Sequence, residues 1–304
     1  MTGVQTCALP ISGTFYTEYQ WARNGDERDN LSLIGMRRRW DLGRGLDLLL
    51  LGERSEIDTA PEKTTRYALA VGLTFENSKG FSISTRNEIR REEGGRDLEQ
   101  FLTTNRAEYL LNPDLKVLGW YRYSYTKDSS LSTTETEFNE LSVGLAYRPV
   151  ANDRFNALFR YTKQSNEPTF FQSQSNDSFT ETDVLSADWS YQITPKLEWV
   201  GKQAIKFSEE TTSGLPTVEN DTLLTIQRFN YNFYRKYELG AEYRLRSQTL
   251  ADDREQGWLV EFMWRPIKHL RLGVGYNFTD FSDDEFSEND FSVKGLFFRI
   301  QGAY

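Results

Sequence analysis

The chain has 304 residues, a formal net charge of -9, 38% hydrophobic and 27% charged residues, and a single cysteine. Its longest apolar run, residues 67–71, is far shorter than the roughly 18 residues that a transmembrane helix needs, which excludes helical membrane proteins. An aromatic content of 14% argues against a disordered chain, and the acidic balance argues against a nucleic-acid partner.

The first segment, residues 1–12 (MTGVQTCALPIS), contains Cys7 and lacks the basic residues and the apolar run of a secretory signal. Its sequence resembles the translation of a common short-read sequencing adapter. We therefore expect residues 1–12 to be a sequencing artefact rather than native protein. We expect residues 13–304 to be one native domain that is truncated at its N-terminus.

From residue 13 onward the dominant pattern has a period of two. In residues 270–279 (LRLGVGYNFT) every second residue is large and apolar, and the residues between are Gly or polar, which predicts a strand with one apolar and one polar face. The prolines after residue 12 fall in connections or at strand ends, as strands require. The pattern predicts about 16 strands, near residues 13–23, 30–42, 45–56, 66–76, 80–91, 98–111, 115–126, 138–148, 154–163, 183–193, 196–207, 221–234, 236–248, 256–266, 269–280 and 291–304.

The links between these strands alternate in length. Short links follow the even-numbered strands, and long polar links follow the odd-numbered ones. Examples are the short links 43–44, 112–114 and 267–268 and the long links 127–137, 164–182 and 283–290. This alternation is typical of outer-membrane barrels. The predicted fold is all-β: an antiparallel up-and-down transmembrane β-barrel of about 16 strands, with short periplasmic turns and longer extracellular loops.

The last segment, GLFFRIQGAY, resembles the C-terminal assembly signal of bacterial outer-membrane proteins. Leu296, Phe298, Ile300 and Tyr304 match this signal, and Gly302 leaves one apolar position empty. The resemblance implies a location in the bacterial outer membrane, contact with outer-membrane lipid and lipopolysaccharide, and recognition by the barrel-assembly machinery. It leaves a homo-oligomer open as a further partner.

Patterns that carry catalysis or metal binding are absent from the sequence. The single histidine, His269, lies in a short link with no nucleophile motif, and zinc would need Cys or His clusters. The acidic link 283–290 lacks the spacing and the glycine of a calcium loop. We expect no enzyme activity, no cofactor and no metal.

The polar face of the strands is the candidate functional site. Its charged residues are expected to line the lumen of the barrel: Arg86, Arg90, Arg106, Arg122, Arg160, Arg244, Arg246, Arg271, Glu88, Glu108, Glu238, Glu242 and Glu261. They form either a pore wall that selects solutes or structural ion pairs between neighbouring strands. The long link 164–182 forms either a constriction or a surface loop.

The favoured function is a polar-lined pore for passive diffusion of small solutes, or the membrane anchor of a larger surface protein. One alternative is a gated receptor or export barrel, similar to TonB-dependent proteins, whose plug or partner domain is missing. The other is a soluble β adhesin.

Overall fold

The computed structural model describes residues 3–5, 13–24, 27–59, 62–95, 97–129, 133–165, 178–212, 215–234, 236–250, 253–278 and 294–302. Every regular element in these ranges is a β-strand. The strands are β1 (Gly3–Gln5), β2 (Gly13–Asn24), β3 (Glu27–Gly43), β4 (Leu46–Thr59), β5 (Glu62–Glu76), β6 (Phe81–Glu93), β7 (Leu98–Asn112), β8 (Leu115–Asp128), β9 (Thr133–Tyr147), β10 (Phe155–Ser165), β11 (Ser178–Thr194), β12 (Leu197–Thr212), β13 (Val218–Tyr234), β14 (Tyr237–Gln248), β15 (Asp253–Ile267), β16 (Leu270–Asn277) and β17 (Gly295–Gly302).

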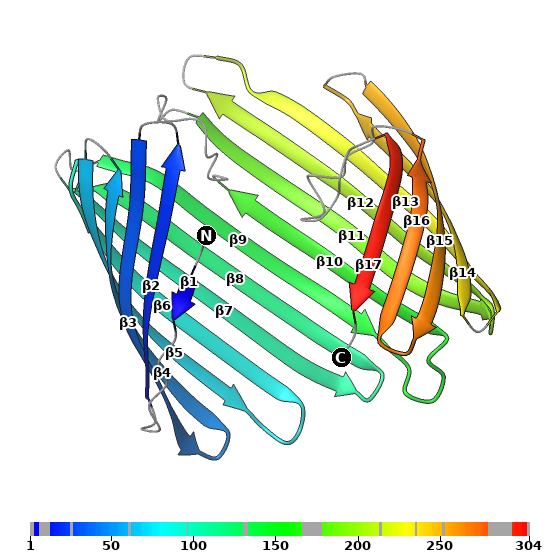
Figure 1. Cartoon of the computed structure of the whole chain (residues 1–304), viewed down its shortest axis with the longest axis horizontal. Coiled ribbons are helices and arrows are strands. Elements are labelled where there is room, and N and C mark those ends of the chain that lie inside the picture. The colour runs from blue at the N-terminus through cyan, green and yellow to red at the C-terminus, as the bar shows by residue number, and fades with distance from the viewer. Residues whose placement is uncertain are drawn as a thin grey trace. The chain divides into compact units, whose positions relative to one another are not determined.

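Strands β2 to β17 correspond one to one to the predicted strands, and neighbours in the chain are neighbours in the sheet (Figure 1). The prediction of an all-β, antiparallel, up-and-down fold is confirmed. The short strand β1 pairs with β2, with Gly3 opposite Tyr19. None of the described residues form a helix that is long and apolar enough to cross a membrane.

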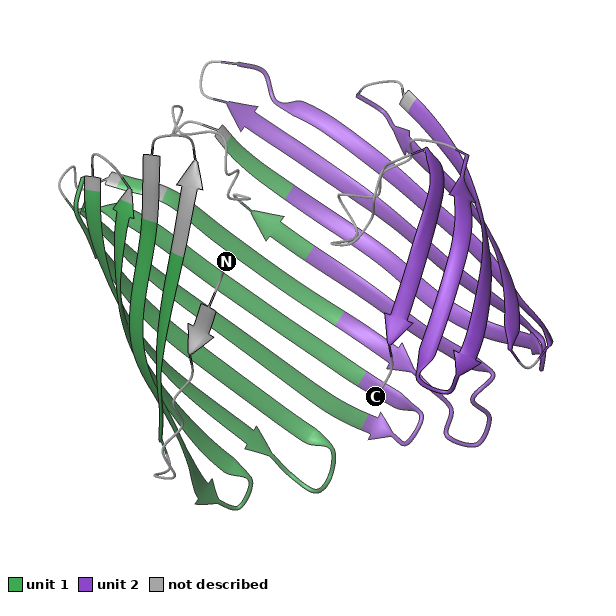
Figure 2. Ribbon diagram, viewed as in Figure 1, with its two compact units in different colours: residues 1–110, 117–143, 163–181 green, residues 111–116, 144–162, 182–304 purple. Residues whose placement is uncertain are grey.

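The chain divides into two compact units (Figure 2). Unit 1 comprises Met1–Leu110, Val117–Val143 and Lys163–Glu181, and unit 2 comprises the remaining residues. Within unit 1, β2 to β7 form an antiparallel meander. Within unit 2, β12 to β17 form a second one.

Most strands extend beyond the predicted boundaries on the side of the long links, whereas β16 and β17 are shorter than predicted. For example, β9 begins at Thr133 rather than near residue 138, and β12 ends at Thr212 rather than near residue 207. The physical reason is that hydrogen bonds between strands need only backbone groups, so a hairpin continues after the apolar alternation stops. On the other rim, the link of residues 148–154 is longer than the two-residue turn at 195–196.

Each unit has an apolar face and a polar face, because successive side chains of a strand point to opposite sides. The apolar face is the exposed one: Leu69 is 59% exposed and Ile300 76% exposed. Several charged residues of the polar face, such as Glu88 and Glu261, are buried. A small buried apolar cluster of Ala204 and Leu224, with Ile226 packed against it, lies on the polar face of β12 and β13.

Candidate functional site

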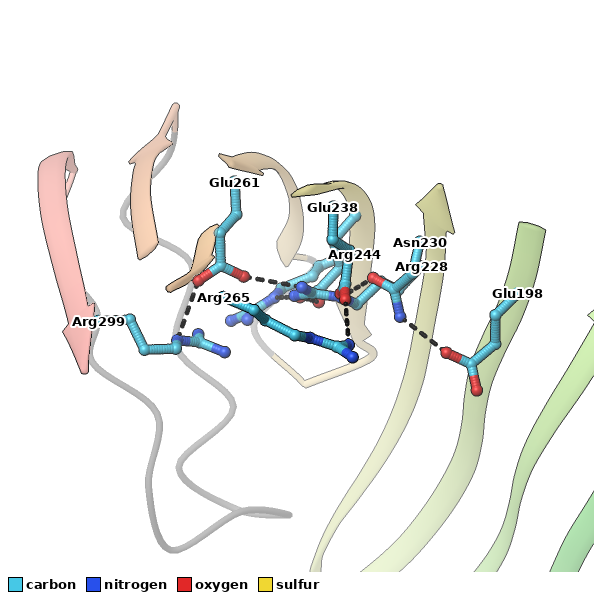
Figure 3. Close-up of polar contacts among 9 residues, drawn as sticks. Glu198, Arg228, Asn230, Glu238, Arg244, Glu261, Arg265 and Arg299 are labelled. Carbon is cyan, nitrogen blue, oxygen red and sulfur yellow. Dashed lines mark hydrogen bonds and ion pairs between the residues drawn. The ribbon is translucent and has the colours of Figure 1, made fainter. Parts of the chain in front are cut away.

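The polar face of unit 2 carries a cluster of ion pairs and hydrogen bonds, drawn in Figure 3. We call it the ionic cluster. Its members come from β12, β13, β14, β15 and β17, and they are Glu198, Arg228, Asn230, Glu238, Glu242, Arg244, Glu261, Arg265 and Arg299.

Arg228 is the centre of the ionic cluster. Its Nη2 donates to Glu261 Oε2 at 2.7 Å, and its Nη1 lies 3.3 Å from Glu242 Oε2. Its Nε donates to Asn230 Oδ1 at 2.7 Å, and the Asn230 amide then donates to Glu198 Oε2 at 3.1 Å. One guanidinium therefore connects side chains from four strands, β12 to β15.

Each carboxylate at the centre has a second arginine. Glu242 Oε1 accepts from Arg244 Nε at 2.5 Å, and Glu261 Oε1 lies 3.0 Å from Arg299 Nε. At the edge of the cluster, Arg265 Nη2 donates to Glu238 Oε2 at 3.1 Å. The side chain of Glu261 has no exposed surface, and that of Arg228 is 17% exposed. A buried charge without a partner is very costly, and the pairing of these two charges avoids that cost.

Glycines let these long side chains cross an intervening strand. Arg228 of β13 reaches Glu261 of β15 diagonally across β14, where Gly240 lies opposite Asn230 on one side and Glu261 on the other. A Cβ atom at Gly240 would lie 2.7 Å from Arg228 Nη2, so any larger residue would force the end of the arginine side chain to shift. A Cβ atom at Gly273 of β16 would meet the sulfur of Met263 first, and it would lie 3.2 Å from Glu261 Oε1 and 3.3 Å from the Cβ of Arg299.

A side chain also crosses a strand at a glycine in unit 1. Tyr16 of β2 crosses β3 at Gly35 and donates a hydrogen bond to Glu53 of β4. A Cβ atom at Gly35 would lie 2.4 Å from the Tyr16 ring. In both units a glycine on the polar face therefore marks a place where a side chain spans three strands.

Further ion pairs follow the polar face of unit 1. Glu88 binds both Arg86, at 2.8 Å, and Arg90. Arg106 Nη2 lies 2.7 Å from Glu108 Oε1. Arg122 of β8 binds Glu140 of β9, and Gln164 of β10 donates to the same carboxylate oxygen at 3.5 Å.

The structure places the predicted lumen residues on the polar face. The strand registers put ten of them there directly: Arg86, Glu88, Arg90, Arg106, Glu108, Glu238, Glu242, Arg244, Arg246 and Glu261. The register of β16 with β17 places Arg271 on the polar face as well. Arg122 lies there because it pairs with Glu140, and Arg160 lies there because it is on the same side of β10 as Gln164, which contacts Glu140. Only Glu238, Glu242, Arg244 and Glu261 belong to the ionic cluster. Arg246 pairs separately with Glu255, at 3.0 Å.

The residues of the predicted assembly signal lie on the opposite face. Leu296, Phe298 and Ile300 alternate along β17 and are among the most exposed apolar residues of the chain. Tyr304 lies outside the described residues, as do residues 166–177 and 279–293, which include most of the long link 164–182 and the whole acidic link 283–290.

Sequence reasoning missed the centre of the ionic cluster. It did not single out Arg228, Asn230, Arg265 or Gly240. The available signal was an interior glycine within a strand, which often marks a close approach of another group. His269 lies exposed in the turn of residues 268–269, and the described residues contain no group of three or more His, Cys, Asp or Glu that could hold a metal ion.

The sequence matches no protein-family model and no curated protein sequence. Its structure is similar to the siderophore receptor PiuA from Acinetobacter baumannii, with a TM-score of 0.57, 12% identity and coverage of 85% of this chain and 57% of that one. It is also similar to BauA, the ferric preacinetobactin receptor from Acinetobacter baumannii (TM-score 0.51, 10% identity, coverage 87% and 61%). The copper transporter OprC gives a TM-score of 0.51 at 9% identity, with coverage of 93% and 65%.

The chain thus spans between 57% and 65% of the length of these proteins. At such low identities the likeness shows the fold alone, and that fold is the outer-membrane β-barrel.

Proposed function

We propose that the chain is an outer-membrane β-barrel whose polar face lines a water-filled path for passive diffusion of small solutes. The observation that carries the proposal is the inverted distribution of side chains. Large apolar residues such as Leu69, Trp258 and Phe298 are exposed on one face, while charged residues are paired on the other. A contiguous exposed apolar surface of this kind suits a bilayer and not water.

The charge pattern of the polar face suggests weak ion selectivity. In the ionic cluster, Arg228, Arg244, Arg265 and Arg299 are balanced by Glu198, Glu238, Glu242 and Glu261. Rings of one sign of charge are what make a pore selective. A balanced wall would pass small polar solutes of either charge.

The test is single-channel recording of the full chain, refolded into planar bilayers after heat-modifiable gel mobility has shown that a barrel formed. We expect discrete ohmic steps and a reversal potential near zero in a KCl gradient. The Arg106→Glu variant reverses a charge that is 56% exposed on the polar face, so it should shift the reversal potential towards cation selectivity.

The matched control is Arg91→Glu. Arg91 lies on the apolar face of the neighbouring strand β6 and is 59% exposed. The same change of charge there should leave the reversal potential unchanged. A folded barrel that gives no steps would contradict a pore and favour a membrane anchor for a larger surface protein.

A gated receptor barrel is the second candidate. It is favoured by one observation: the similar solved structures include the siderophore receptor PiuA and the ferric preacinetobactin receptor BauA, each considerably longer than this chain. A receptor barrel would give no steady conductance and would bind a ferric siderophore with measurable affinity. The exposed apolar face weighs against the soluble adhesin, because a soluble sheet would cover that face with a second layer.

A further inference from the structure

The polar face of unit 1 carries a group of charges in which arginine is in excess. We call it the basic group, and it consists of Arg37 of β3 and Arg86, Glu88 and Arg90 of β6. Both arginines of β6 bind the same carboxylate: Arg86 Nη2 lies 2.8 Å from Glu88 Oε2, and Arg90 Nε binds Glu88 Oε1. One negative charge is therefore shared by two positive charges.

The two arginines of β6 are accessible although they are held in place. The side chains of Arg86 and Arg90 are 47% and 40% exposed, whereas that of Glu88 is 3% exposed. Arg90 Nη1 also donates to Gln100 Oε1 at 3.4 Å, and the Gln100 amide donates to Thr126 Oγ1 at 3.2 Å. A guanidinium has five N–H donors, so these contacts within the described chain leave donors for a ligand.

Arg37 adds a third positive charge from another strand. In the register it lies in one row with Leu51 of β4, Ala70 of β5 and Glu88 of β6. Leu51 and Ala70 are buried and uncharged, so they separate Arg37 from Glu88 without neutralising either. Arg37 is exposed, and the described residues provide no ion-pair partner for it.

The carboxylates that flank the basic group have partners of their own. Glu53 of β4, in the same row as Arg90, accepts a hydrogen bond from Tyr16. Glu92, the next residue of this face on β6, binds Arg66 through Nε at 2.8 Å and Nη2 at 2.6 Å. Even with the charge of Glu53 included, the three arginines of the basic group face two carboxylates, and a positive charge is left over.

The basic group lies at the depth of the apolar band and not at a rim. On β3, the exposed apolar residues Ile34 and Leu42 lie on either side of Arg37 along the strand. Ionisable residues at membrane depth are costly unless they face water or bind a partner, and they mark the paths of substrates. An excess of arginine in such a place suits an anionic substrate.

We propose that the basic group binds the oxyanion, a carboxylate or a phosphate, of a small organic solute in the lumen. A guanidinium suits both anions, because its N–H donors form a planar fork that matches two oxygens. The inference rests on the proposed function and names the class of solute that the pore takes. One unbalanced charge in a wall of ion pairs should retain an anion briefly without excluding cations.

The ionic cluster of unit 2 differs from the basic group in both respects. Its arginines and carboxylates are equal in number, and its central arginine, Arg228, is 17% exposed. It therefore has neither the excess charge nor the accessible donors that an anionic solute needs.

The first test uses single channels of the full chain in planar bilayers, with succinate and the diamine putrescine as probes of opposite charge. Succinate should interrupt the current, and putrescine at the same concentration should not. Arg37→Gln should shorten the interruptions about tenfold, because one hydrogen bond between charged groups is lost. The control Arg91→Gln removes an arginine from the apolar face of β6 and should leave the interruptions unchanged.

Inorganic phosphate distinguishes the two sources of the oxyanion. Longer interruptions by succinate than by phosphate would assign the basic group to carboxylates, and the reverse would assign it to phosphorylated solutes. Open channels that neither anion interrupts would overturn the inference while the pore itself stands. Equal shortening by Arg37→Gln and Arg91→Gln would also overturn it.

A second measurement does not depend on conductance or on a variant that folds. Phenylglyoxal modifies arginine side chains, and mass spectrometry of the unaltered chain in phospholipid vesicles gives the rate at each position. Succinate or phosphate should slow the modification of Arg37 and Arg86 but not that of Arg91. A silent barrel with this protection would contradict the pore and support the binding site, whereas a folded barrel without protection would overturn the binding site.

Discussion

Replacing Gly240 by alanine should destabilise the protein through a single clash. The new Cβ atom would lie 2.7 Å from Arg228 Nη2, whereas ordinary van der Waals contact begins at 3.4 Å. The guanidinium must therefore move by a few tenths of an ångström or more. We expect this movement to break its 2.7 Å hydrogen bond to the buried carboxylate of Glu261.

The magnitude follows from two opposing effects. Losing one hydrogen bond between charged groups costs about 1.5–3 kcal/mol. Replacing glycine by alanine in a strand recovers about 0.5–1 kcal/mol, because alanine loses less backbone freedom on folding. We expect Gly240→Ala to lower the free energy of unfolding by about 0.5–2.5 kcal/mol.

The assay is urea unfolding of the protein refolded in phospholipid vesicles, followed by the fluorescence of its 7 tryptophans. The control is Gly52→Ala in β4, where a Cβ atom would meet nothing within 4 Å and no loss is expected. In an Arg228→Ala background the penalty of Gly240→Ala should disappear, since there is no guanidinium left to displace. An unchanged penalty in that background would refute the reasoning.

Three further changes test other parts of the structure. Gly35→Ala should cost about 1 kcal/mol in the same assay, since a Cβ atom 2.4 Å from the Tyr16 ring displaces its hydroxyl from Glu53; an unchanged midpoint would speak against this contact. Leu69→Arg places a charge on the apolar face and should cost about 2–4 kcal/mol in vesicles, and a neutral result would mean that this face does not meet lipid. Phe298→Asp in β17 should reduce the amount of heat-modifiable protein assembled in outer membranes. Normal assembly of this variant would show that Phe298 is not part of the assembly signal.

The sheet order and the two faces were predictable from the sequence because strand alternation has a fixed period. Residues 270–279 alternate without error, and β16 begins at Leu270. The strand ends were less predictable. Polar residues such as Thr133 continue a hairpin through backbone hydrogen bonds, and backbone pairing leaves no side-chain pattern in the sequence.

The ionic cluster could not be predicted because it depends on register. Arg228 lies on a strand whose polar face also carries Leu224 and Ile226, so alternation is weak there. Its contact with Glu261 spans two strand pairings, and a shift of one residue in either would send one of the two side chains to the other face.

The most direct test of the central claim is to label one pair of neighbouring residues on β7. Arg106 lies on the polar face and Ala107 on the apolar face. In the C7S background, R106C and A107C are reconstituted in lipid vesicles and treated with a membrane-impermeant maleimide. If the polar face lines a water-filled lumen and the apolar face meets lipid, R106C reacts and A107C does not. Equal labelling of both, or labelling of A107C alone, would contradict a membrane barrel with an aqueous interior.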